Sequence, residues 1–448
     1  MYCNLKKTTF RRLTLITTIS FLCSLNSANA QDDRFEDPPT FKASEVLPED
    51  ILKSPYHEVQ EEVSVVRYGY QFTLETPEGT AEVWSKEMLN KRIRESAAIK
   101  KLNEISQTDA FVTSISEAAK KPLAMVWNIA SNPVSTVTGL PGGVSRYLKG
   151  GFYKIRKTSS AISRTISKED EEAAEAEKKL EDEKDEESLS KQAAQTTSDL
   201  SKQHLGFNRA KRTWAQRMKV DPYSDNQALQ KALERIAWAT SLGSFAGDVS
   251  IPSYSALDYT AEVQSLVWET PPIELERMNE ERLKRAGLDE DDILDFHEHK
   301  QYNISAKTAI TLGIEKLKDV KGVSEMLKIV MAAEDIFEAT MMIKLTAILS
   351  NYHTLETPLN KIEIRRGLIT AVDEKNILIF PIAIEYLYWT PLAQEIAGAD
   401  EFNHPDRELW ITGNASAISI EELLSLNWTT RENCFELFKA KEVQPTSN

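Results

Sequence analysis

His297 and His299, in the sequence DFHEH, are the residues of this chain whose types and spacing best suit a metal ion. Imidazole nitrogens are common protein ligands of zinc and similar divalent ions. Side chains two residues apart fall on the same face of a strand, but on a helix they diverge by roughly half a turn. The surrounding residues have a helical pattern, so the alternative is a polar helix end that leads into the loop QYN.

A hydrolytic metal centre would need at least one ligand in addition to the two histidines. The candidates, adjacent in sequence or brought near by folding, are Asp295, Glu298, His353 and His404. Three protein ligands and one position left for water would allow a divalent ion to activate that water. The alternative function predicted from the sequence is therefore a metal-dependent hydrolase centred on His297 and His299, with a divalent metal as its cofactor.

Other compact catalytic motifs are missing from the sequence. It contains no HExxH, CxxC or GxSxG, and no GxxxxGK followed by Ser or Thr. The sequence around Ser244 resembles a nucleophile elbow only superficially, because Leu242 occupies the position of the first glycine. The segment DEDDILD lacks the glycine of a calcium-binding loop. Active sites also assemble from scattered residues, but no catalytic residue is assigned here, and the primary prediction is a non-enzymatic protein without a cofactor.

Cationic and aromatic residues gather in the Gly- and Pro-containing segment 118–168. This basic segment contains nine Lys or Arg and no Asp or Glu, whereas the whole chain has a formal net charge of −15. Rings next to cations are typical of contacts with anionic lipid head groups, because rings lie at the membrane boundary and charges at phosphate level. The residues predicted to make this contact are Arg146, Tyr147, Lys149, Phe152, Tyr153, Lys154, Arg156 and Lys157.

The partner of the basic segment is open at this point. An anionic membrane surface and another envelope protein are the two external candidates. We expect no nucleic acid, because the acidic remainder of the chain repels a polyanion at long range. The internal alternative is the acidic stretch 169–187, which contains twelve Asp or Glu against three Lys. If the two stretches neutralise each other, no external anion is needed.

The first thirty residues are typical of a secretory signal peptide. Four basic residues precede or begin an apolar run from Leu13 to Leu25, and Ala28 and Ala30 supply the small residues of a cleavage site. We expect cleavage after Ala30 and export to the bacterial periplasm or the cell exterior. Since the removed segment has four basic and no acidic residues, the net charge changes from −15 to −19. Cys434 is then the remaining cysteine, and we expect it to be buried.

The predicted fold class is α+β and predominantly α-helical, with two short β-hairpins, a charged connector that is helical or disordered, and a larger C-terminal helical domain. Alternating apolar and polar residues from Val66 to Leu74, followed by the turn TPEG, predict the first hairpin. Strand-like runs from Lys361 and Ile377 predict the second. The widest apolar helical stripe lies between Val323 and Leu349 and predicts a central helix.

Helix starts and changes in composition suggest how the chain is divided. SDNQ predicts a helix capped by Ser224, and LDEDD predicts another helix start. The expected divisions are a signal peptide over 1–30, an extended arm over 31–62, a hairpin-plus-helix module over 63–117, the basic segment over 118–168, an acidic connector over 169–205, and a helical domain over 206–448 with its hairpin at about 361–386.

Overall fold

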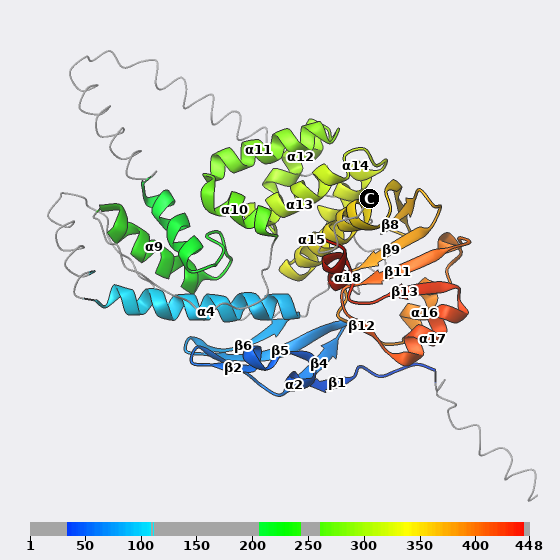
Figure 1. The fold of residues 1–448 in the computed structure, drawn as a ribbon, viewed down its shortest axis with the longest axis horizontal. Coiled ribbons are helices and arrows are strands. Elements are labelled where there is room, and N and C mark those ends of the chain that lie inside the picture. The colour runs from blue at the N-terminus through cyan, green and yellow to red at the C-terminus, as the bar shows by residue number, and fades with distance from the viewer. Residues whose placement is uncertain (1–33, 109–110, 112–205, 243–259, 443–448) are drawn as a thin grey trace, which may run out of the picture.

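The computed structural model describes residues 34–108, 111, 206–242 and 260–442, so the predicted signal peptide, basic segment and acidic connector lie outside the described residues. Of the described residues, 54 % are helical and 20 % are in strands. They form a six-stranded N-terminal sheet, a group of helices, a five-stranded C-terminal sheet and a small two-stranded sheet (Figure 1). The prediction of a predominantly helical fold with two short hairpins was therefore wrong, and the fold is mixed.

The N-terminal sheet is antiparallel and curled. β4 and β3 pair with successive parts of one edge of β5, and β6 pairs with the other edge. Short helices α2 (Ala43–Val46) and α3 (Glu49–Leu52) join the first strands, so residues 40–62 belong to this sheet where an extended arm was expected. The strands are β1 (Thr40–Lys42), β2 (Lys53–Ser54), β3 (His57–Val59), β4 (Glu62–Val66), β5 (Gly69–Thr76) and β6 (Gly79–Trp84).

A two-residue turn divides the alternating run that predicted one strand. Arg67 and Tyr68 form this turn between β4 and β5, with φ angles of 53° and 69°. Such turns need positive φ at both central residues and favour Asn and Gly there, so the sequence carries no signal of this one. The next turn, TPEG, does join paired strands, β5 and β6.

Helix α4 (Lys86–Ser106) lies between the N-terminal sheet and α9 (Gln227–Leu242) (Figure 1). Its C-terminal half packs in one apolar cluster with α9 and with the helix over residues 206–217. Phe111, Trp214 and Ala215 belong to the same cluster, so the described residues on both sides of 112–205 meet there. The cap of α9 is Asn226, whose side chain accepts the N–H groups of residues 228 and 229, and not Ser224 as predicted.

The central helices are arranged around α13 (Ile304–Lys316), which packs against α10, α11 and α15. The stripe that predicted one helix from Val323 to Leu349 forms two, because the chain breaks before Asp335 and this residue caps a new helix. Asp289 caps α12, as LDEDD predicted. The other helices are α10 (Ala261–Glu269), α11 (Pro272–Arg285), α12 (Glu290–Glu298), α14 (Val323–Val330), α15 (Ile336–Asn351) and the π-helical turn η1 (Tyr352–Glu356).

The C-terminal sheet has the strand order β13-β11-β9-β8-β7. β7, β8 and β9 are antiparallel neighbours, whereas β9, β11 and β13 are parallel. A turn at Arg366 and Gly367 splits the first run of the predicted hairpin into β7 and β8. The sequence predicted two strands here, whereas this sheet has five. The strands are β7 (Leu359–Arg365), β8 (Leu368–Asp373), β9 (Leu378–Ile382), β11 (Arg407–Ile411) and β13 (Trp428–Arg431).

The crossovers between the parallel strands contain α16 (Pro391–Ala397), the 3-10 turn η2 (Asp400–Phe402) and α17 (Ala417–Ser425). β10 (Tyr386–Leu387) and β12 (Asn414–Ala415) pair as the small parallel sheet, and α18 (Cys434–Glu442) packs against η1 and α15. Cys434 is fully buried, which confirms the expected burial. Across the described ranges, no helix combines the length and the apolar character needed to cross a membrane.

Candidate functional site

A small pocket lies where the N-terminal sheet, α4, α15 and the segment between β9 and β10 meet. Its volume is about 80 Å³. The β4–β5 turn, the β6–α4 junction, α15 and the segment after β9 each supply part of its wall. The residues that give the pocket its chemical character are Arg67, Trp84, Phe337, Met341, Lys344 and Glu385.

Glu385 is the buried carboxyl group of this pocket, and it is 6 % exposed. Its Oε2 accepts the backbone N–H of Tyr70 at 2.8 Å, and its Oε1 accepts the backbone N–H of Lys86 at 2.7 Å. Lys86 is the first residue of α4, so the carboxyl group lies at the positive end of the helix dipole. The side chain therefore joins β5 to the start of α4.

The surroundings of Glu385 change its acidity. Burial, and then the nearby charge of Glu87, raise the pKa of Glu385 to about 7. The Lys344 ammonium and the two backbone donors act in the opposite direction without outweighing the burial. Because this pKa lies near neutral pH, Glu385 can gain or lose a proton under physiological conditions, a property common among functional carboxyl groups.

Lys344 and Glu87 form an ion pair beside Glu385. The Lys344 Nζ lies 2.6 Å from the Glu87 Oε2, and the side chains are 13 % and 41 % exposed, respectively. Burial lowers the pKa of Lys344, but the charges of Glu87 and Glu385 raise it more strongly, so the ammonium stays protonated. One cation thus lies between two carboxyl groups, and the charge of the group depends on the protonation of Glu385.

The strained β4–β5 turn holds Arg67 at the pocket. Tyr68 has positive φ, which is unfavourable for a bulky residue, but its carbonyl accepts the backbone N–H groups of Glu385 and Tyr386 at 2.9 and 3.1 Å. Its hydroxyl also lies 2.5 Å from the Thr390 hydroxyl. Strain of this kind persists where surrounding contacts oppose it. Arg67 is half-buried and, within the described residues, makes no hydrogen bond or ion pair.

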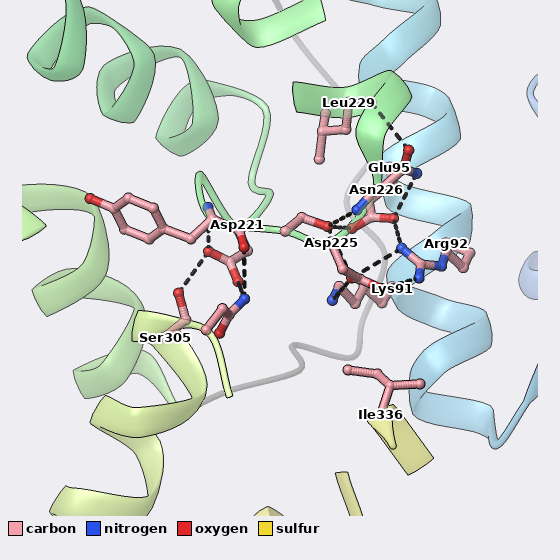
Figure 2. A network of polar contacts seen from close by, with 12 residues as sticks. Lys91, Arg92, Glu95, Asp221, Asp225, Asn226, Leu229, Ser305 and Ile336 are labelled. Atoms are coloured by element: carbon pink, nitrogen blue, oxygen red, sulfur yellow. Dashed lines mark hydrogen bonds and ion pairs between the residues drawn. The ribbon is translucent and has the colours of Figure 1, made fainter. Parts of the chain in front are cut away.

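A second polar cluster holds α4 in position (Figure 2). Lys91 and Arg92 of α4 pair with Asp225, at 2.8 and 2.6 Å. Glu95 accepts hydrogen bonds from Arg92 and Asn226, at 2.7 and 2.9 Å. Burial raises the pKa of Asp225, but the Lys91 and Arg92 charges outweigh it and hold that pKa below its usual value. The cluster therefore joins α4 to the start of α9.

The same cluster reaches α13 through Asp221. Its Oδ1 accepts the Ser305 hydroxyl at 2.7 Å, and its Oδ2 lies 3.2 Å from the Asn303 amide nitrogen (Figure 2). Burial raises the pKa of Asp221, although Lys91 and the Ser305 donor lower it. Because all these side chains satisfy one another, we interpret the cluster as structural support for α4, whose first turn forms part of the pocket.

The predicted metal residues lie around the end of α12 and do not converge. The His299 Nε2 lies 2.9 Å from the Met331 carbonyl, and its Nδ1 accepts the Gln301 N–H at 3.3 Å, so the backbone engages both ring nitrogens. The His297 Nε2 is buried, without a hydrogen-bond partner in the described part of the chain. Over the described ranges, no three His, Cys, Asp or Glu side chains could share a metal ion. The metal site stays a prediction without support from these residues.

The other predicted ligands lie elsewhere. His353 accepts the Leu359 N–H through Nδ1 at 2.9 Å, and the Nδ1 of His404 lies 2.8 Å from the Asp406 carbonyl. Asp295 and Glu298 are in α12. The predicted contact residues 146–157 lie outside the described residues, so the contact surface also stays a prediction.

Sequence reasoning did not find the pocket. Its signal was a charged residue within an apolar run: Lys344 interrupts the stripe of α15, and Glu385 follows the apolar run of β9. A charge in such a position is costly to bury unless it is paired. The pattern indicates that Lys344 and Glu385 each need a partner, but it does not identify the distant residue that provides it.

Comparison of the chain with protein-family models, with curated proteins and with solved structures finds no match. The function is therefore argued from the composition of the chain and from the geometry of the described residues.

Proposed function

We propose that this chain is an exported, non-enzymatic, envelope-associated protein that contacts an anionic membrane surface through residues 144–157. The observation that carries the proposal is charge segregation. Nine cations and no anion lie in the basic segment of a chain with a net charge of −15. Each Lys or Arg close to an anionic membrane surface contributes about 1 kcal/mol of binding free energy, and aromatic side chains add contacts at the boundary.

The structure supports this proposal through the residues on either side of 112–205. Phe111 precedes this stretch, Trp214 and Ala215 follow it, and all three pack in one cluster with α4 and α9. The described residues that flank the stretch therefore meet at one place in the folded body. This short separation is compatible with a long inserted segment that contacts an external surface.

Vesicle flotation tests the proposal with the chain that begins at Gln31. We expect recovery with vesicles that contain anionic lipid, little recovery with neutral vesicles, and a decrease as salt screens the charges. The test variant replaces five cations by Gln: Arg146, Lys149, Lys154, Arg156 and Lys157. The matched control makes the same change at five exposed cations of the folded body: Lys53, Lys219, Lys300, Lys318 and Lys375.

The two variants have the same net charge and differ only in where the charges are removed. We expect the first to lose flotation and the second to keep most of it. Equal recovery of the wild type and the first variant at low salt would contradict the membrane contact. Loss of flotation in both variants would show that overall charge, and not the basic segment, controls binding.

A further inference from the structure

We propose that the pocket at Arg67, Lys344 and Glu385 binds a small organic anion, namely a monocarboxylate with a short aliphatic tail. This site is separate from the membrane contact proposed above and consists only of described residues. It joins cationic groups to apolar walls in one small pocket. These are the two features that an amphipathic acid requires.

The charges of the pocket favour an anion. Lys344 is paired with Glu87, whereas Arg67 makes no ion pair within the described residues and lines the same pocket. When Glu385 is protonated, the charges of Arg67, Lys344 and Glu87 sum to +1. A guanidinium group binds a carboxylate through two parallel hydrogen bonds, so Arg67 is the residue we assign to the carboxylate of the ligand.

The walls of the pocket suit an aliphatic tail. Met88 and Met341 line it together with Trp84 and Phe337, whose rings meet edge to face with centroids 5.7 Å apart. Methionine side chains adapt to irregular apolar ligands. With roughly 10–15 Å³ for each water-sized group, a volume of about 80 Å³ holds about five to eight non-hydrogen atoms, the size of butyrate or valerate.

The backbone around the pocket is already in place. Ser85 caps α4 with a φ of 71°, and Arg67 and Tyr68 also have positive φ. The two hydrogen bonds from residues 385 and 386 to the Tyr68 carbonyl hold the turn against the opposite wall. Because hydrogen bonds within the chain hold this conformation, binding requires little further ordering of the chain.

Protonation of Glu385 couples binding to pH. The groups that face Glu385 are Glu87 and the Lys86 N–H from α4, Lys344 from α15 and Tyr70 from β5, and Arg67 lines the same pocket. Among these groups, Glu385 is the one whose pKa lies near neutral pH. A bound carboxylate favours the neutral form of Glu385, so affinity increases as the pH falls through about 7, and binding takes up a proton.

Methyl NMR of the full chain with ¹³C-labelled methionine tests the site with butyrate as the probe. Met88 and Met341 lie in the pocket, whereas Met218 is buried in the cluster of α4 and α9 and serves as the internal control. We expect butyrate to shift Met88 and Met341 saturably and to leave Met218 unchanged. Butylamine, which has a similar size but the opposite charge, should cause no saturable shift.

The pH dependence and one pair of variants complete the test. With a pKa near 7, the protonated fraction of Glu385 falls from about 0.9 at pH 6 to about 0.1 at pH 8, so butyrate affinity should fall about tenfold. Arg67→Gln should weaken binding at least about tenfold, the loss of a charged hydrogen bond. Arg366→Gln is the matched control, because Arg366 begins the equivalent turn between β7 and β8 with a φ of 51° and lies outside the pocket.

Three results would overturn the proposal. They are uniform shifts of all methionine methyls, equal affinity for butyrate and butylamine, and an affinity that does not rise between pH 8 and pH 6. Equal weakening by Arg67→Gln and Arg366→Gln would count against it too. Because these experiments leave residues 144–157 unchanged, their failure is distinguishable from a failure of vesicle flotation.

Discussion

The Glu385 carboxylate accepts the backbone N–H of Tyr70 at 2.8 Å, although the two residues are 315 positions apart in the chain. The same carboxyl group accepts the N–H of Lys86 at the start of α4. One ionisable side chain therefore links the N-terminal sheet, the first turn of α4 and the segment that follows β9. Its protonation state should affect both the stability of the protein and the chemistry of the pocket.

Glu385 should make the protein less stable as the pH rises from about 4.5 to 7. The native state keeps a proton that the unfolded state releases over this interval, so the free energy of unfolding falls with pH. A pKa of about 7 against a usual value of 4.5 corresponds to a change on the order of 3 kcal/mol. Urea unfolding between pH 5 and 8 measures it. Glu385→Gln should be less stable overall, because its amide faces two N–H donors. Its free energy of unfolding should not fall with pH over this interval. If the free energies of the variant and the wild type changed with pH in parallel, the prediction would be contradicted.

Replacing the two members of the ion pair should move the midpoint of Glu385 in opposite directions. Glu87→Gln removes a negative charge that raises the pKa of Glu385, so the midpoint should fall. Lys344→Met removes a positive charge that lowers this pKa, so the midpoint should rise. The pH titration of the Met341 methyl resonance reports both. Shifts of the same sign would show that unfolding or rearrangement, and not charge, controls the titration.

Gly413→Ala should strongly destabilise the protein, because a Cβ atom at this position would lie 1.9 Å from the backbone oxygen of Glu385. A backbone atom cannot move aside as a flexible side chain can, and we expect a loss of roughly 3 kcal/mol. The matched control is Gly206→Ala, where no atom lies within 4 Å. Gly206 lies in the helix described over residues 206–217, so this control should be neutral or slightly stabilising. Thermal unfolding of both variants measures the difference in stability. Equal melting temperatures would contradict the close approach of residue 413 to the Glu385 backbone oxygen.

Asp225 should make the protein sensitive to acid. Its pKa in the native state lies below that in the unfolded state, so its stabilising effect is present above about pH 4 and is lost as the pH falls further. Asp225→Asn should remove this part of the acid sensitivity and weaken the junction of α4 with α9. Glu290→Gln is the control, because the Glu290 side chain is 88 % exposed. Acid titration followed by circular dichroism should separate Asp225→Asn from the wild type, while Glu290→Gln should overlap with it.

The folded body should survive replacement of residues 112–205 by a flexible linker. The described residues on both sides of the stretch pack in one cluster, so a Gly/Ser linker of about 20 residues, with a mean span near 25 Å, should join them. We expect an unchanged melting temperature and loss of vesicle flotation. A large fall in melting temperature would show that the deleted residues contribute to the core.

The sequence was most informative where structure depends on near neighbours. Asp289 caps α12 through the N–H of Asp292, three residues away, and the turn TPEG joins β5 to β6. It was less informative where a turn lacks its usual residues. Arg67 and Tyr68 carry no turn signal, and contacts with residues 385–390 hold them in a strained conformation that no local preference predicts.

The sequence by itself determined the charge segregation, the apolar stripes and the Asp289 cap of α12, because these properties depend on residues a few positions apart. Only the tertiary structure decided that Arg67, Lys344 and Glu385 share one pocket and that β9, β11 and β13 pair in parallel. These contacts join distant parts of the chain, and their geometry is set by how sheets and helices pack. The burial that raises the pKa of Glu385 results from that packing, so the apolar run before residue 385 marks the residue but does not reveal the distant groups that surround it.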